Sequence, residues 1–206
     1  MSRTIPIFAI ALLSAVLVWM VYFWNPASSP LSSHERLGLS ARPVGGDFRL
    51  SAADEPFDLS DLRGQVSLVY FGYTACPDIC PTNLAIIALA LRALTPRELG
   101  RVQVVFVSVD PERDSTERLN EYVGFFHPSI IGVTGTPEEI AGAAAQYGAA
   151  YRRAEQPESA MGYTVDHSAH TYVVNPSGEL VEVLDHATPA EEIVATLRRH
   201  LDQSAG

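Results

Sequence analysis

The chain has 206 residues, which is enough for one ordinary domain and an additional segment. Its formal net charge is −10, and arginine supplies all of its Lys-or-Arg positive charge. Nucleic-acid binding needs a basic surface, so the acidic composition excludes nucleic acid as a partner.

An apolar segment without a charged side chain, residues 5–24, comes first along the chain. Its 20 residues can span a hydrocarbon core of ~30 Å as a helix. Aromatic side chains gather at its C-terminal end, at Trp19, Tyr22, Phe23 and Trp24. A cleaved signal peptide is the competing interpretation, but its apolar region is usually ~7–15 residues long and is followed by small residues. The pattern therefore favours an uncleaved transmembrane anchor.

The charges beside this segment predict its orientation. Arg3 precedes it, and the first acidic residue is Glu35, so the positive-inside rule places residues 1–4 in the cytoplasm. The remainder carries 13 arginines and 24 acidic residues, a net charge of −11. We expect a single-pass protein of a bacterial inner membrane, with its C-terminal domain in the periplasm, where disulfides are permitted.

Residues 25–43, rich in Ser, Pro and Ala, are expected to form a flexible tether to a domain at residues 44–202. Two short β-like runs, residues 48–50 and 57–59, predict an N-terminal hairpin. Strands and helices then alternate, and residues 150–165 are irregular or hairpin-like. The predicted strands are 66–73, 102–109, 130–133, 171–174 and 180–184, and the predicted helices are 84–94, 115–126, 137–147 and 190–201.

The only two cysteines, Cys76 and Cys80, follow the first central strand where a helix is expected to begin. Packing alone does not need two cysteines at such a corner, so the pair indicates redox chemistry or binding of a soft metal. A helix starting after Ala75 would place both sulfurs on one face, near enough for a disulfide or a two-thiolate clamp for Cu(I). The element order and this motif together predict an α/β fold: a thioredoxin-like central sheet with flanking helices, preceded by the hairpin and the transmembrane helix.

Asp78, between the cysteines, bears on the choice between the two chemistries. Its negative charge raises a thiol pKa and disfavours an activated nucleophile. A bound cation would make the same charge favourable, which favours metal binding. The alternative is that Asp78 is only a helix-start residue at the positive end of the helix dipole.

The six histidines supply candidates for a third ligand: His34, His127, His167, His170, His186 and His200. His127 and His200 lie at helix ends, where structural roles are expected. His167 precedes the strand 171–174, in the loop that faces the cysteine corner of a thioredoxin-like sheet. It can complete a site with two sulfurs and one nitrogen, although spacing alone leaves this open.

Four motifs occur in order along the domain: Gly46-Asp47-Phe48, Tyr70-Phe71-Gly72-Tyr73-Thr74-x-Cys76-Pro77-Asp78-x-Cys80-Pro81, Ser108-Val109-Asp110-Pro111-Glu112-Arg113-Asp114 and Val165-Asp166-His167-Ser168. Together they resemble the SCO/SenC family of membrane-anchored copper chaperones over residues 44–201. The resemblance implies copper, as Cu(I) and as a further candidate Cu(II), bound by Cys76, Cys80 and His167. It also implies delivery to the copper A centre in subunit II of cytochrome c oxidase, with a periplasmic copper donor and a thiol reductant as further partners.

One residue departs from the family's motifs, and three others have more than one possible role. Gln65 stands where a lysine is common in the family. His170 is a secondary Cu(II) ligand or a sheet residue. Asp110 and Asp166 can orient His167, or Asp110 belongs to a turn before a helix.

A thiol–disulfide oxidoreductase that keeps an exported client's cysteines reduced is the alternative function, with Cys76 and Cys80 as its redox pair. The wider cysteine spacing and the histidine loop count against it. Peroxide reduction fits less well, because Thr74 lies two residues before Cys76 and Asp78 brings the wrong charge.

Overall fold

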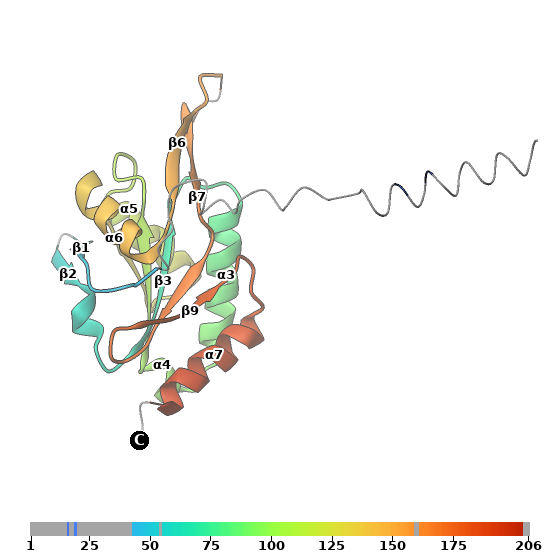
Figure 1. The fold of residues 1–206 in the computed structure, drawn as a ribbon. Coiled ribbons are helices and arrows are strands. Elements are labelled where there is room, and N and C mark those ends of the chain that lie inside the picture. The colour runs from blue at the N-terminus through green and yellow to red at the C-terminus, as the bar shows by residue number, and fades with distance from the viewer. Residues whose placement is uncertain (1–15, 17–18, 20–42, 54, 159–160, 204–206) are drawn as a thin grey trace, which may run out of the picture. The chain divides into compact units, whose positions relative to one another are not determined.

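The computed structural model describes residues 43–53, 55–158 and 161–203, together with Val16 and Trp19 as single helical positions (Figure 1). Contacts group residues 41–206 into one compact unit and residues 1–40 into another. The predicted cytoplasmic end, anchor and tether lie almost entirely outside the described residues. Within the part of the chain that is described, no helix has both the length and the apolar character needed to cross a membrane.

A five-stranded mixed sheet forms the centre of the domain, in the order β5-β4-β3-β8-β9. Its members are β3 (Val66–Gly72), β4 (Val102–Ser108), β5 (Ile130–Val133), β8 (Thr171–Val174) and β9 (Leu180–Leu184). The first three run parallel, and β8 and β9 continue the sheet in antiparallel pairings. Every residue of β3 is buried, as its continuous apolar pattern predicts for a strand covered on both faces.

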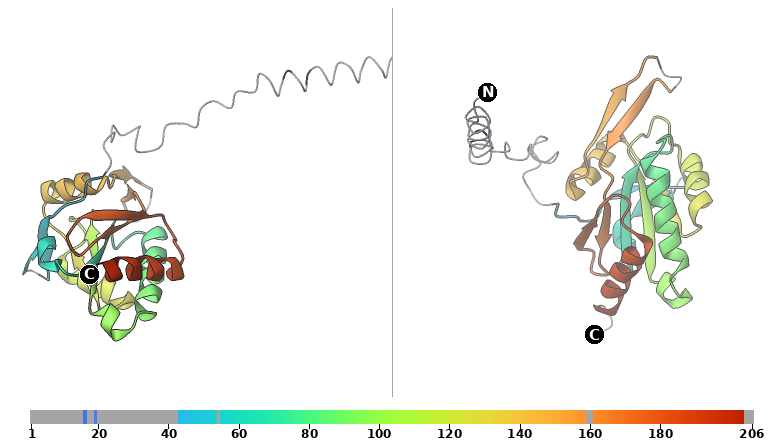
Figure 2. Two further views of the ribbon diagram at one scale, coloured as in Figure 1. Left: turned by 60° about the horizontal axis from the view of Figure 1, so that its bottom comes forward. Right: turned by 90° about the vertical axis from the view of Figure 1, so that its right-hand side faces the viewer.

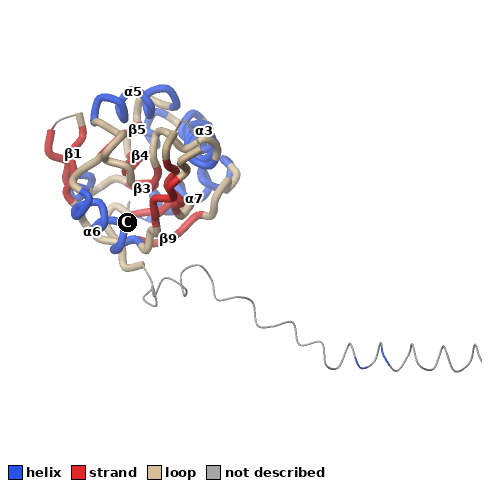
Figure 3. The backbone as a smooth tube through the Cα atoms, turned by 90° about the horizontal axis from the view of Figure 1, so that it is seen from above, coloured by secondary structure: helices blue, strands red, loops and turns tan. Residues whose placement is uncertain are grey.

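Helices cover both faces of this sheet, and they surround its strands when the domain is viewed from above (Figure 3). They are α3 (Ile79–Arg92), α4 (Pro96–Leu99), α5 (Thr116–Phe126), α6 (Pro137–Tyr147) and α7 (Ala190–Gln203), with a 3-10 turn η1 at Leu59–Leu62. On the face with α5, the Tyr70 ring packs beside Phe106, which in turn meets Tyr122. On the face with α6, Phe71 packs against Tyr147. Neighbouring residues of β3 thus contribute to separate apolar layers.

Two hairpins complete the domain. The first pairs β1 (Arg49–Ala52) with β2 (Glu55–Asp58), close to the prediction. The second pairs β6 (Tyr151–Glu155) with β7 (Tyr163–His167) and extends away from the central sheet (Figure 2). Gly148 ends α6 in the left-handed conformation, with φ of 64°, and turns the chain into β6.

The predicted strands and helices are present, and the largest differences lie around α3. This helix begins at Ile79, five residues earlier than predicted, and it includes the second cysteine. Thr95 and Pro96, which follow the predicted end of this helix at residue 94, begin the short helix α4. The Thr95 side chain accepts a hydrogen bond from the Glu98 N–H, and the Glu98 carboxylate accepts one from the Thr95 N–H, which is a complete capping box.

Candidate metal centre

The two cysteines sit on either side of the start of α3. Cys76 lies in the cysteine loop, residues 73–78, where its N–H donates to the Tyr73 carbonyl (3.2 Å). Cys80 is the second residue of α3, followed by Pro81, whose missing N–H is tolerated in a first helical turn. The two cysteines would share one helical face only if the helix began after Ala75, and this condition is not met, since Cys76 precedes the helix. A turn of the loop, instead, brings its sulfur back toward Cys80.

His167 approaches the cysteines from another part of the chain, as the last residue of β7. Its Nδ1 lies 3.0 Å from the Ser168 carbonyl oxygen. A carbonyl can only accept a hydrogen bond, so Nδ1 donates to it, and Nε2 is the ring nitrogen that faces the cysteines. This Nε2 lies 3.2 Å from the Cys80 sulfur. The Tyr73 ring meets the imidazole edge-to-face at 5.7 Å between centroids and supports its orientation.

Cys76, Cys80 and His167 thus form a group whose donor atoms all lie within 4.8 Å of one another. Both thiols are free and buried, and the histidine is half-buried. Two sulfurs and one imidazole nitrogen suit soft or borderline metals such as Cu(I) and Zn²⁺, and they do not suit Mg²⁺ or Ca²⁺. Three donors also leave room for a further ligand.

Gly72, at the end of β3, allows the Cys80 sulfur to reach this position. A Cβ at residue 72 would lie 2.7 Å from the Cys80 Sγ and 2.8 Å from a ring carbon of Phe106. The sulfur therefore rests directly against the backbone of the central strand. A glycine in a buried strand signals such a close approach, and the sequence analysis made no use of it.

The two thiols differ in their readiness to ionise. A hydrogen bond from Cys80 lowers the pKa of Cys76 to about 3, although burial acts in the opposite direction. Hydrogen bonds from His167 and from the backbone N–H of Asp78 also lower this pKa. Burial raises the pKa of Cys80, and its hydrogen bond to Cys76 adds to that. Asp78 is exposed and its side chain makes no capping bond. The expectation that Asp78 holds the thiol pKa high is therefore wrong for Cys76, where its N–H acts in the opposite direction.

Buried phenols form the wall behind the sulfurs. Burial raises the pKa of Tyr70 and of Tyr122 well above the ordinary value, so both rings are neutral. Neither hydroxyl has a nitrogen or oxygen partner among the described residues. The sulfurs consequently face a buried wall, where a thiolate is stable only when it is paired with a cation or a hydrogen-bond donor, and the Tyr70 hydroxyl is a donor toward Cys80.

Neither aspartate expected to orient His167 contacts it. Asp110 is buried and accepts hydrogen bonds from the Tyr163 hydroxyl (2.8 Å) and from Arg113. Asp166 is exposed and pairs with Arg152 at 2.9 Å. The Ser168 carbonyl orients the imidazole instead, a backbone role that side-chain patterns cannot reveal.

Asp114 is a residue of the site's support that the sequence analysis missed. Its fully buried carboxylate accepts from the Thr74 N–H (2.9 Å), the Thr74 hydroxyl (2.6 Å) and the Ser108 hydroxyl (2.7 Å). Thr74 lies two residues before Cys76, so Asp114 fastens the cysteine loop to the end of β4. Its position in the run 110–114, which belongs to one of the four family motifs, was the available signal, but no role was predicted for Asp114 itself.

The other described histidines lie outside the three-donor group. His127 is buried at the end of α5, its Nδ1 accepts from the Ser129 N–H, and burial lowers its pKa. His200 lies 3.4 Å from a Glu182 carboxylate oxygen. These two are structural, as predicted. His170 lies 3.3 Å from Asp185, His186 is exposed, and His34 falls outside the described residues.

The fold and the site define a class of protein: a thioredoxin-like domain in which two cysteines after a central strand meet a histidine from an added hairpin. The family model described as SCO1/SenC matches residues 38–202. The chain therefore belongs to the SCO1/SenC family, and the resemblance noted from its motifs is confirmed.

Curated relatives carry the same family name. Mouse "Protein SCO2 homolog, mitochondrial" is 40% identical over 158 residues, which is 76% of this chain and 62% of that protein. Yeast (Saccharomyces cerevisiae) "Protein SCO1, mitochondrial" is 34% identical over 202 residues, covering 94% of this chain and 68% of that protein. The chain thus spans about three fifths of the length of the mouse relative.

Solved structures agree with the fold. Arabidopsis thaliana ScoI with copper bound superposes with a TM-score of 0.69 at 35% identity, over 77% of this chain and 98% of that one. Apo Sco1 from Thermus thermophilus gives a TM-score of 0.70 at 40% identity, over 77% of this chain and 92% of that one. The thioredoxin-like prediction is therefore confirmed for the described domain.

Proposed function

We propose that this protein binds copper through Cys76, Cys80 and His167 and serves the assembly of cytochrome c oxidase by delivering the metal to the copper A centre of subunit II. The observation that carries the proposal is the Nε2 of His167, which lies 3.2 Å from the Cys80 sulfur and in one group with Cys76. Copper bound in the Arabidopsis relative and membership of the family support the choice of metal.

The donor set suits a metal that is held and then passed on. Thiolates are soft ligands that favour Cu(I), and an imidazole nitrogen also suits Cu(II). With three protein donors, a ligand from the acceptor can bind before the first ones leave, so copper need not be released into water. Transfer then proceeds by ligand exchange.

The proposed location and partners follow from the rest of the chain. The apolar segment 5–24 supports a single transmembrane anchor, with residues 1–4 in the cytoplasm and the domain in the periplasm of a bacterial inner membrane. In an oxidising compartment the two thiols need a reductant before they can bind copper, and the metal must come from a periplasmic donor.

Anaerobic titration of Cu(I) against a competing chelator tests this proposal on the full chain in detergent, with the cysteines reduced. We expect one copper per chain, and much weaker binding in Cys80→Ser and His167→Ala. His170→Ala is the matched control, because His170 lies three residues along the chain but outside the donor group, and it should bind as the parent does. Binding that is weak in the parent, or indifferent to His167, would overturn the copper assignment.

A thiol–disulfide oxidoreductase is the second candidate, and the pKa of Cys76, lowered to about 3, favours it. The Cys76 thiolate would attack a client disulfide and form a mixed disulfide, and Cys80 would then displace the reduced client and close an internal disulfide. Reductase activity that persists in His167→Ala, with no change in copper binding, would favour this function. Loss of Cu(I) binding in the same variant would favour the first.

A further inference from the structure

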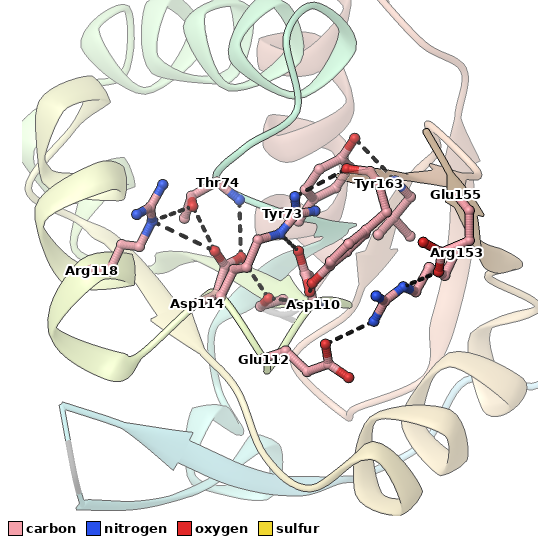
Figure 4. A network of polar contacts seen from close by, with 12 residues as sticks. Tyr73, Thr74, Asp110, Glu112, Asp114, Arg118, Arg153, Glu155 and Tyr163 are labelled. Atoms are coloured by element: carbon pink, nitrogen blue, oxygen red, sulfur yellow. Dashed lines mark hydrogen bonds and ion pairs between the residues drawn. The ribbon is translucent and has the colours of Figure 1, made fainter. Parts of the chain in front are cut away.

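The segment between β4 and α5, Asp110–Asp114, contacts both parts of the metal centre. Its last residue, Asp114, holds Thr74 and thereby the cysteine loop, as described above. Arg118 adds to this end, because its Nε donates to the Thr74 hydroxyl at 2.7 Å. Figure 4 shows these contacts meeting around the buried Asp114 carboxylate.

The first residue of the same segment holds the strand that carries His167. The Asp110 carboxylate accepts from the Tyr163 hydroxyl at 2.8 Å and is paired with Arg113, which also donates from Nη1 to the Tyr163 carbonyl (3.1 Å). Tyr163 begins β7, and His167 ends it. Asp110, Arg113 and Tyr163 therefore connect the histidine strand to the segment that holds the cysteine loop, and we term them the hairpin clamp.

Cation–aromatic stacking reinforces the clamp. The guanidinium carbons of Arg113 and Arg153 each lie 3.7 Å from the centre of the Tyr163 ring. Glu112 and Glu155 pair with Arg153 at 2.8 and 2.7 Å, so the added positive charge is balanced. Burial raises the pKa of Tyr163 to about 12, which keeps its hydroxyl protonated and able to donate to Asp110.

Direct contact between the hairpin and the cysteine loop is weaker than the clamp. The Val165 N–H donates to the Tyr73 hydroxyl at 3.3 Å, the long end of the hydrogen-bond range. Otherwise β7 is paired with β6, and that pair forms a sheet of its own, separate from the central sheet. No ladder joins the described hairpin to the central sheet, so the clamp acts beside the Tyr73 ring and the short link from His167 to β8 in holding the imidazole near the sulfurs.

We propose that Asp110, Arg113 and Tyr163 are positioning residues that hold His167 against the two thiols and thereby set how well the site retains Cu(II) relative to Cu(I). This inference rests on the proposed function. Two thiolates alone can hold Cu(I), whereas Cu(II) favours the imidazole nitrogen. Loosening the hairpin should consequently weaken Cu(II) binding more than Cu(I) binding, while loosening the cysteine loop should weaken both oxidation states to a similar extent.

Tyr163→Phe tests the clamp by removing only the hydroxyl that Asp110 accepts, and Asp110→Asn combined with it loosens the clamp further. Tyr151→Phe is the matched control. Tyr151 lies opposite His167 in the same hairpin, and its hydroxyl makes no hydrogen bond in the part of the chain that is described. Thr74→Val serves as the counterpart at the cysteine end, since it removes a hydroxyl that donates to Asp114.

The first measurement needs no metal. Copper-free full chain in detergent is treated with diethyl pyrocarbonate, and the modification rate of His167 is read by mass spectrometry relative to the exposed His186. A hydrogen bond to a charged group corresponds to about a tenfold change in a local opening equilibrium. We expect the His167 rate to rise by up to about tenfold in Tyr163→Phe, to rise further in the double variant, and to stay at the parent value in Tyr151→Phe.

The second measurement compares Cu(II) and Cu(I) affinities of the same variants. Tyr163→Phe should lose up to about tenfold in Cu(II) affinity and less than that in Cu(I) affinity, whereas Thr74→Val should weaken both forms to a similar extent. A lower melting temperature with an unchanged His167 rate and an unchanged ratio of the two affinities would overturn the proposal, because the clamp would then only stabilise the fold. If the parent bound neither form of copper, the proposed function would fail, and the modification rates would still show whether the clamp positions His167.

Discussion

Replacing Gly72 with alanine tests whether the position of the Cys80 sulfur depends on a bare backbone. The added Cβ would lie 2.7 Å from the sulfur and 2.8 Å from a ring carbon of Phe106. Ordinary contacts between such atoms are roughly 3.5–4.0 Å, so one of the neighbours must move by about 1 Å. Phe106 and Cys80 are both fully buried, but the sulfur is a single atom on one rotatable bond and needs less space than the ring to turn aside.

The size of the effect on stability and on copper binding depends on whether the added methyl group strains the copper-free protein or displaces Cys80. Overpacking a well-packed core destabilises by about 1–3 kcal/mol. If the strain stays in the copper-free protein, about 2 kcal/mol lowers the melting temperature by roughly 4–8 °C for a domain of this size. If Cys80 moves aside instead, copper must restore its position, and the same energy weakens Cu(I) binding by about 30-fold. We predict that the two effects together account for about 1–3 kcal/mol.

Thermal unfolding followed by circular dichroism and the Cu(I) competition titration measure the two effects separately. Gly124→Ala in α5 is the matched control, because a Cβ at that position meets nothing within 4 Å. It should leave copper binding unchanged and hold or raise stability, since alanine is the better helix former by about 1 kcal/mol. A Gly72→Ala protein with the parent's melting temperature and the parent's Cu(I) affinity would refute the reasoning.

The remaining predictions concern the reactivity of one thiol, one hydrogen bond of a buried tyrosine, and one glycine with a positive φ. Because the pKa of Cys76 is lowered to about 3, its thiolate should already be present at about pH 5, and its alkylation by iodoacetamide should change little up to about pH 7. A rate that rises about tenfold per pH unit, read by mass spectrometry, would show an ordinary thiol instead. Tyr147→Phe removes a 3.0 Å hydrogen bond to the Gly46 carbonyl and should destabilise by about 1 kcal/mol in urea unfolding; no change would mean that water replaces the hydroxyl. Gly148→Ala should destabilise by about 1–2 kcal/mol in the same assay, because residue 148 has φ of 64°, and equal stability would contradict the strain argument.

Local patterns in the sequence were sufficient for most of the fold. The continuous apolar run of β3 predicted a central strand, and Thr136 followed by proline predicted the start of α6, where the structure shows a capping box. Such elements depend on residues within a few positions of one another. The sequence also singled out Cys76 and Cys80, because they are its only two cysteines, whereas His167 was assigned among six histidines through the family resemblance.

The tertiary structure decided how those residues work together. The contact between Cys80 and His167 joins positions 87 residues apart, and the bonds from Thr74 to Asp114 join positions 40 apart. Local patterns do not report contacts at such separations, so the support by Asp114 and the role of the Ser168 carbonyl went unseen. The influence of Asp78 was misjudged for the same reason: a pKa depends on which donors surround a thiol in space, and the charge of a sequence neighbour gave the wrong sign.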